Sequence, residues 1–190
     1  MKPFQRIRGI SKMLGVHNSS KIWPISSKTK MELLKEYWIP WSVSNGLAIL
    51  VLIAALKKTR LARLLMFILF AWASWFNYTT AHNSPSDYLI YATLTPVDLY
   101  SNFINTTFKA NIVPLVTVIA IGQALIAIGM LLHRWWVKLA CMGTILFFLA
   151  IAPLGIGSGF PATLIGALAV FLIVKNDPLD YLWISSSKVQ

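Results

Sequence analysis

The chain has 190 residues, of which 57% are hydrophobic and only 12% are charged. Soluble domains carry about 25% charged residues, so this composition leaves too little polar surface for a protein surrounded by water. Lys and Arg outnumber Asp and Glu by 17 to 6, giving a formal net charge of +11. Because many of these basic residues flank apolar runs, we interpret them as topology signals that attract anionic lipids, and we expect no nucleic acid partner.

Residues 1–38 form a basic amino-terminal segment. They hold eight Lys and Arg side chains, and the acids among them are Glu32 and Glu36. No apolar core follows the basic residues, so the segment does not have the pattern of a cleavable signal peptide. We expect it to be surface-lying or flexible, with Lys28–Trp38 able to form an amphipathic helix in the membrane interface.

Ile39–Leu56 is the first apolar run, and Pro40 stands near its start. Its strongly apolar part, Leu47–Leu56, is short for a helix that crosses a bilayer of about 30 Å. Two arrangements therefore stay open, a full crossing and a re-entrant segment that dips in and returns. We expect a crossing.

Three later stretches contain no Lys, Arg, Asp or Glu: 64–81, 110–132 and 139–174. About 18 or more apolar residues can cross the hydrocarbon core, and helices satisfy their own backbone there. These stretches predict four spans, at about 64–77, 112–132, 139–156 and 162–174. With the amino-terminal fifth span, the expected fold is an all-α, polytopic transmembrane helix bundle over residues 39–176, followed by a short tail, 177–190.

Aromatic and basic residues mark the expected membrane interfaces, where such side chains are enriched. One group stands near the expected end of the first charge-free span, and the other stands in the turn before the third. The predicted interface anchors are Trp72, Trp75, His133, Arg134, Trp135 and Trp136.

Residues 78–109 form a long outer loop in which tyrosines are mixed with acids. This composition predicts one or two short helices lying on the bilayer face rather than a structureless linker. A histidine near carboxylates can shuttle protons or hold a metal, although the spacing matches no metal motif and we expect no metal site. The polar ligand candidates in and beside this loop are Asn77, Tyr78, His82, Asp87 and Asp98. A solvated loop face is the alternative interpretation, and the one we favour.

Gln123 lies at the middle of the predicted span 112–132. An unpaired amide in hydrocarbon is costly, so Gln123 is expected to clasp another helix through a hydrogen bond or, alternatively, to contact a ligand. Two small-residue stripes indicate close helix approach: Ala120, Ala124 and Ala127, and Ala162, Gly166 and Ala169.

Two short basic turns, Lys57–Arg63 and His133–Lys138, fall on one side if every predicted span crosses. The facing side has only Lys109 in its long loop. The positive-inside tendency therefore places both turns and the carboxyl terminus in the cytoplasm. The basic amino-terminal segment opposes this assignment, because five crossings put it outside.

The residues that carry reaction chemistry are sparse. Cys141 is the only cysteine and lies in an apolar run, so it is expected to remain an inert thiol. We predict no catalytic residue. A transporter is a weaker interpretation, because the sequence has no internal inverted repeat and its spans predict no buried charge.

From about Leu64 the chain carries a first span, a long outer loop, and then AIGQALIAIGMLL (120–132) followed by a short basic turn. A further segment, APLGIGSGFP (152–161), precedes the last span. Over roughly residues 64–174 this pattern resembles the DoxX-like family of small bacterial membrane proteins. The resemblance implies a multi-pass protein of the cell membrane, acting as a non-catalytic or accessory subunit beside a partner membrane subunit. It also implies, as an alternative, a quinone-linked subunit of an oxidoreductase, with quinone as the cofactor. No residue motif carries that activity over.

Overall fold

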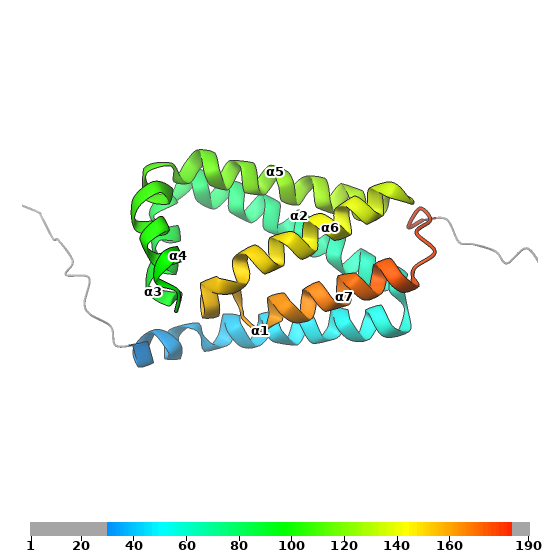
Figure 1. The fold of residues 1–190 in the computed structure, drawn as a ribbon, viewed down its shortest axis with the longest axis horizontal. Coiled ribbons are helices and arrows are strands. Elements are labelled where there is room, and N and C mark those ends of the chain that lie inside the picture. Colours follow the sequence, from blue (N-terminus) through cyan, green and yellow to red (C-terminus); the bar gives the residue numbers. More distant parts are fainter. Residues whose placement is uncertain (1–29, 184–190) are drawn as a thin grey trace, which may run out of the picture.

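The computed structural model describes residues 30–183, so the expectations for residues 1–29 lie outside the described chain. Five long helices lie side by side as a bundle, and the described residues contain no strand (Figure 1). The all-α prediction is confirmed. The five are α1 (Lys30–Lys57), α2 (Thr59–Asn83), α5 (Ile112–Leu131), α6 (Trp135–Ile151) and α7 (Ala162–Asn176).

The bundle consists of two helix pairs joined by a fifth helix. α2 packs along α5, α1 packs along α7, and α6 contacts both α5 and α7 (Figure 1). The buried core includes Met66 and Phe70 of α2, Met130 of α5 and Val170 of α7. Large apolar side chains also cover the outside of these helices, as expected where lipid is the solvent.

α1 is one continuous helix of 28 residues with Pro40 inside it. Proline removes one backbone donor from a helix, and here the helix continues on both sides of it. Residues 30–38 are therefore the first turns of α1 rather than a separate segment. The re-entrant alternative for Ile39–Leu56 is wrong for this structure, because the helix does not turn back before Lys57.

α2 is longer than the predicted span 64–77, because it continues to Asn83. In the added turns the Thr79 hydroxyl bonds to the carbonyl oxygen of Trp75 at 2.9 Å, so this polar side chain finds its partner within the helix. Trp72 precedes the helix end by eleven residues, about 16 Å at the rise of an α-helix. Its predicted place near the end of the helix was wrong.

Four helical segments are long and apolar enough to cross a membrane: Tyr37–Lys57, Thr59–Asn83, Ile112–Leu131 and Trp135–Ser158. The segment Ile39–Leu56, for which a crossing and a re-entrant form were both open, thus lies in a helix long enough to cross. α7, expected as a firm span, has only 15 residues and is the shortest of the five. By length and composition, this is a multi-pass membrane protein with a helix bundle.

Short helices close one end of the bundle within the predicted outer loop (Figure 1). One or two were expected, and the structure has four short helical elements there. They are η1 (Pro85–Ile90), α3 (Tyr91–Leu94), α4 (Asp98–Phe103) and η2 (Ile104–Phe108). The Thr95 hydroxyl donates to the carbonyl of Pro153 at 2.7 Å, and the Tyr100 hydroxyl donates to that of Ala150 at 2.8 Å. These bonds hold the short helices against the end of α6 and against η3 (Ala152–Ser158).

The hairpin between η3 and α7 lies at the same end. Gly159 adopts a φ of 74°, a left-handed conformation that glycine takes without steric cost. The Trp41 indole donates to the carbonyl of Phe160 at 2.7 Å, and the Asn45 amide donates to that of Gly159 at 3.0 Å. The first half of α1 is therefore fixed to this end, which we call the loop end.

The opposite end holds the turn between α1 and α2, the turn between α5 and α6, and the described tail, 177–183 (Figure 1). We call it the basic end. α1 runs from the loop end to the basic end, so residues 30–36 begin on the opposite side of the bundle from the two basic turns.

Small residues mark the closest helix contacts, as predicted. Ala162, Gly166 and Ala169 are all buried on α7. A Cβ at Gly166 would stand 2.7 Å from the Phe148 ring, and a Cβ at Gly129 would stand 2.7 Å from the Ala140 Cβ. In the other predicted stripe, Ala120 and Ala127 are buried, and Ala124 is half-buried.

Candidate functional site

Gln123 lies in the middle of α5 and is buried against α2. The Asn77 side-chain amide donates a hydrogen bond of 2.8 Å to Gln123 Oε1. One turn away on each helix, the Ser74 hydroxyl donates to the carbonyl of Ala120 at 2.7 Å. Gln123 thus forms an interhelical hydrogen bond of the kind predicted for a clasp, and its partner is another of the predicted candidates.

Tyr88 extends this contact toward the loop end. Its hydroxyl donates to Asn77 Oδ1 at 3.0 Å. Burial, with a smaller contribution from Tyr91, raises the pKa of Tyr88 to about 12, so the hydroxyl stays protonated and remains a donor. Tyr88, Asn77 and Gln123 form one chain, in which each side chain donates to the next.

Tyr88 was not among the residues predicted as candidates. One signal could have found it: a tyrosine shortly after a polar helix end, among apolar neighbours, needs a partner for its hydroxyl when it is buried.

The remaining loop candidates do not join this chain of hydrogen bonds. Tyr78 and His82 stack one turn apart on α2, with ring centroids 4.3 Å apart, and His82 Nδ1 lies 2.8 Å from the Tyr78 carbonyl oxygen. Asp87 and Asp98 are exposed on the short helices. Within residues 30–183 no three His, Cys, Asp or Glu side chains are grouped as metal ligands.

A second polar centre lies at the basic end and was not predicted. Arg63 is 1% exposed, and its guanidinium forms an ion pair of 2.9 Å with the buried carboxylate of Asp177. The expectation of no buried charge was therefore wrong. Arg63 belongs to the predicted basic turn Lys57–Arg63, but it shares the inward face of α2 with Met66 and Phe70. That spacing of three and four residues was the signal for its burial.

Arg63 satisfies all five of its N–H donors, the full number that a guanidinium carries. Besides Asp177 Oδ1, it donates twice to the carbonyl of Met130 and once each to those of Leu132 and Asp180, at 2.8–3.1 Å. The last carbonyls of a helix lack hydrogen-bond donors within the helix. At the end of α5, Arg63 supplies these donors.

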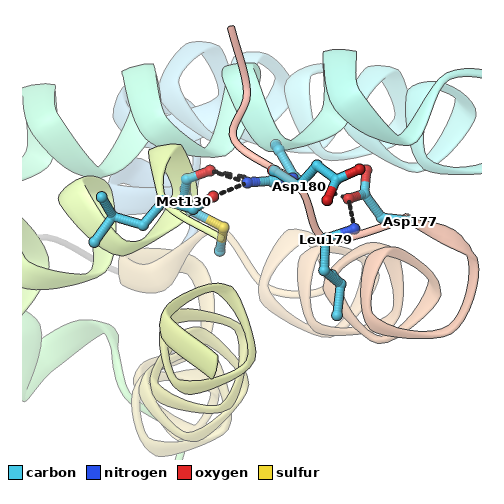
Figure 2. Close-up of polar contacts among 6 residues, drawn as sticks. Met130, Asp177, Leu179 and Asp180 are labelled. Carbon is cyan, nitrogen blue, oxygen red and sulfur yellow. Dashed lines mark hydrogen bonds and ion pairs between the residues drawn. The ribbon is translucent and has the colours of Figure 1, made fainter. Parts of the chain in front are cut away.

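The tail closes over this centre (Figure 2). Asp177 Oδ1 also accepts the backbone N–H of Leu179 at 2.7 Å, which makes a tight turn with a Leu179 φ of 59°. The Leu179 carbonyl in turn accepts the Arg134 backbone N–H at 2.6 Å, and the Leu182 N–H donates to Leu131 at 3.2 Å. Three distant segments, the α1–α2 turn, the α5–α6 turn and the tail, are thus bonded together.

The predicted interface anchors are largely on the surface. Trp72, Trp75, Trp135 and Trp136 each expose more than half of their area, and Arg134 is exposed. His133 differs, because it is half-buried and its ring stacks on Tyr181 of the tail at 4.2 Å. In this structure its ring contacts the tail, and its role as a membrane-interface anchor stays a prediction.

Comparison with protein-family models, with curated proteins and with solved structures finds no match for this chain.

Proposed function

We propose that the protein is a small DoxX-like integral membrane protein of the cell membrane, acting as a non-catalytic or accessory subunit of a larger membrane assembly. The observation that carries this proposal is that the buried polar groups bond to one another and join parts of the bundle. Asn77 bonds to Gln123, and Arg63 bonds to Asp177, so both centres join helices or close the bundle. Such bonds suit a rigid structural element.

The outer surface supports the same proposal. α2 presents Ile68, Trp72, Trp75 and Phe76 outward, and the Trp72 and Phe76 rings stack at 5.2 Å. Since Trp72 stands far from the helix ends, it does not lie where interfacial tryptophans are usually found. A partner membrane subunit could pack its own side chains against these rings, since helix contacts in lipid are stabilised by close packing.

A crosslinking experiment tests the accessory role. A photoreactive phenylalanine analogue replaces Trp72 on the exposed face of α2, or Phe70 on its buried face as the matched control. Illumination of the source cells should join the Trp72 position, but not the Phe70 position, to a second protein. Native electrophoresis in a mild detergent should show the full chain in a larger assembly. Migration as a single chain, together with no crosslink from Trp72, would contradict the proposal.

We further propose that the basic end faces the cytoplasm. Lys57, Lys58, Arg134 and Lys138 are exposed there, whereas the described loop end exposes Asp87 and Asp98 beside Lys35 and Lys109. The positive-inside tendency favours this orientation. It places residues 30–36 outside, because α1 begins at the loop end.

The second candidate function is a quinone-linked subunit of an oxidoreductase. The chain of donors from Tyr88 through Asn77 to Gln123 favours it, because a quinone carbonyl needs a hydrogen-bond donor in an apolar setting. A soluble quinone analogue titrated against the purified chain should quench its tryptophan fluorescence, and Gln123→Leu should weaken the binding. The control is Gly122→Ala, whose added Cβ meets no atom within 4 Å. Equal binding by both variants would reject Gln123 as a contact.

A further inference from the structure

The basic end presents a concentrated positive surface. Five exposed basic side chains are placed there by three separate segments of the chain. They are Lys57, Lys58, Arg134, Lys138 and Lys175. Arg63 is not part of this surface, because it is buried and paired with Asp177.

Acidic side chains do not balance this surface. The chain has six Asp and Glu residues in all. Four of them belong to the first turns of α1 or to the outer loop: Glu32, Glu36, Asp87 and Asp98. Of the two at the basic end, Asp177 is buried and Asp180 is half-buried with its own interaction. No exposed acid therefore lies among the described residues of the basic end.

Aromatic side chains accompany these cations. Trp135 and Trp136 are exposed at the start of α6, and the ammonium group of Lys138 lies 5.5 Å from the Trp135 ring centroid. Tryptophan is enriched at the level of lipid headgroups. Cations beside tryptophans at the ends of membrane helices match the chemistry of a phospholipid interface.

We propose that the basic end is an assembled binding surface for anionic phospholipid headgroups, and that the Arg63–Asp177 pair holds its three segments in place. Arg63 bonds the start of α2 to the end of α5 through Met130 and Leu132. Asp177 and Leu179 attach the tail to Arg63 and to Arg134. The exposed cations are therefore brought together by a centre that itself carries no exposed charge.

This proposal rests on the membrane location and not on the accessory role or the family resemblance. It differs from simple charge attraction in one respect. Simple attraction depends on the number of basic residues alone, whereas an assembled surface also depends on the pair beneath it. Asp177→Asn separates the two, because it removes a negative charge while it leaves all five exposed cations in the chain.

The experiment uses the purified full chain in neutral detergent micelles, titrated with phosphatidylglycerol or, as the uncharged lipid, phosphatidylcholine. Binding is read by native mass spectrometry and by tryptophan emission. Lys57→Gln/Lys138→Gln removes two exposed cations from the basic end. The matched control, Lys35→Gln/Lys109→Gln, removes two exposed cations from the loop end.

The original chain should bind phosphatidylglycerol in preference to phosphatidylcholine. Since each basic side chain near the headgroups contributes about fivefold in affinity, the basic-end variant should bind phosphatidylglycerol at least tenfold more weakly. The loop-end control should bind within about twofold of the original. Equal affinities of the two double variants, or equal affinities for the two lipids, would overturn the proposal, and an acidic protein would then be the better occupant.

The Asp177→Asn variant tests whether lipid binding depends on the Arg63–Asp177 pair beneath the surface. If it remains folded by circular dichroism, it should bind phosphatidylglycerol more weakly despite its more positive charge. Unchanged or tighter binding by the folded variant would show that lipid binding depends on the number of charges alone, and would overturn this part of the proposal. If it does not fold, Arg63→Met/Asp177→Leu, which removes both charges, replaces it with the same expectation.

Discussion

Arg63 and Asp177, which are 114 residues apart in the chain, form an ion pair of 2.9 Å that is almost entirely shielded from solvent. The pair joins the start of the second helix to the tail that follows the last one. It also places a guanidinium against the end of α5, where the carbonyl oxygens of Met130 and Leu132 accept hydrogen bonds from its N–H groups. One arginine therefore connects three parts of the bundle.

Asp177→Asn should strongly destabilise the protein. It leaves the Arg63 charge buried without a counterion, and breaking a buried pair in this way costs about 3–5 kcal/mol. Arg63→Met/Asp177→Leu should cost less than Asp177→Asn, because it removes both charges. Thermal unfolding in detergent measures the order. Asp98→Asn, at an exposed position of α4, is the control and should leave the melting temperature unchanged. A single variant as stable as the original chain would argue against the pair.

The hydrogen bond between Asn77 and Gln123 should stabilise the contact of α2 with α5. Gln123→Leu should lower the free energy of unfolding by about 1 kcal/mol, in line with interhelical hydrogen bonds in membranes. A double-mutant cycle with Asn77→Leu isolates the pair. The two effects should not add, since both variants remove the same bond. Strict additivity would show that the two side chains act independently.

Gly129 should be required for the close approach of α5 to α6. Gly129→Ala places a Cβ 2.7 Å from the Ala140 Cβ, closer than such atoms approach. Overpacking of this kind costs about 1–3 kcal/mol. Gly122→Ala, on the same helix, meets nothing within 4 Å and is the matched control. Melting temperatures in detergent should fall for the first variant only, and equal effects would contradict the packing described here.

Tyr88 should make stability depend on pH in the alkaline range. Its pKa is raised by burial from 10.0 to about 12, so the folded state favours the neutral phenol. This contribution is fully present below pH 10 and is lost as the pH rises through 12, because the unfolded chain ionises first. By pH 11 the loss is about 1 kcal/mol.

Tyr88→Phe cannot titrate at this position and serves as the comparison. Its stability deficit relative to the original chain should shrink between pH 9 and pH 11, measured by unfolding in detergent at each pH. A deficit that stays constant would mean that Tyr88 ionises normally in the folded protein.

Apolar runs predicted the bundle well, because the cost of unpaired backbone groups in lipid leaves few structures other than helices. They predicted helix ends poorly. α2 continues past Asn77 to Asn83, and the Thr79 hydroxyl within these turns bonds to its own helix, so polar composition alone did not end the helix. Likewise, α1 continues through Pro40, which had been placed at the opening of the span.

The polar centres were predicted in part. Gln123 stood out because an amide in an apolar span must find a partner, but nothing in the spacing identified Asn77 as that partner. Arg63 was missed because it lies in a run of basic residues that looks solvated as a whole. Asp177 lies 114 residues away, and a single sequence does not reveal contacts over that distance.

We infer that the bundle crosses the membrane with α1 as a complete span, so that the loop end and the basic end face opposite compartments. Single cysteines in a Cys141→Ala background test it directly, with an impermeant thiol reagent added to intact cells. Cysteines at Lys35 and Ser86, both exposed at the loop end, should be labelled. Cysteines at Lys58 and Trp135, exposed at the basic end, should be labelled only after the membrane is opened. Labelling of Lys35 and Lys58 from the same side would show that α1 does not cross, and would contradict this account.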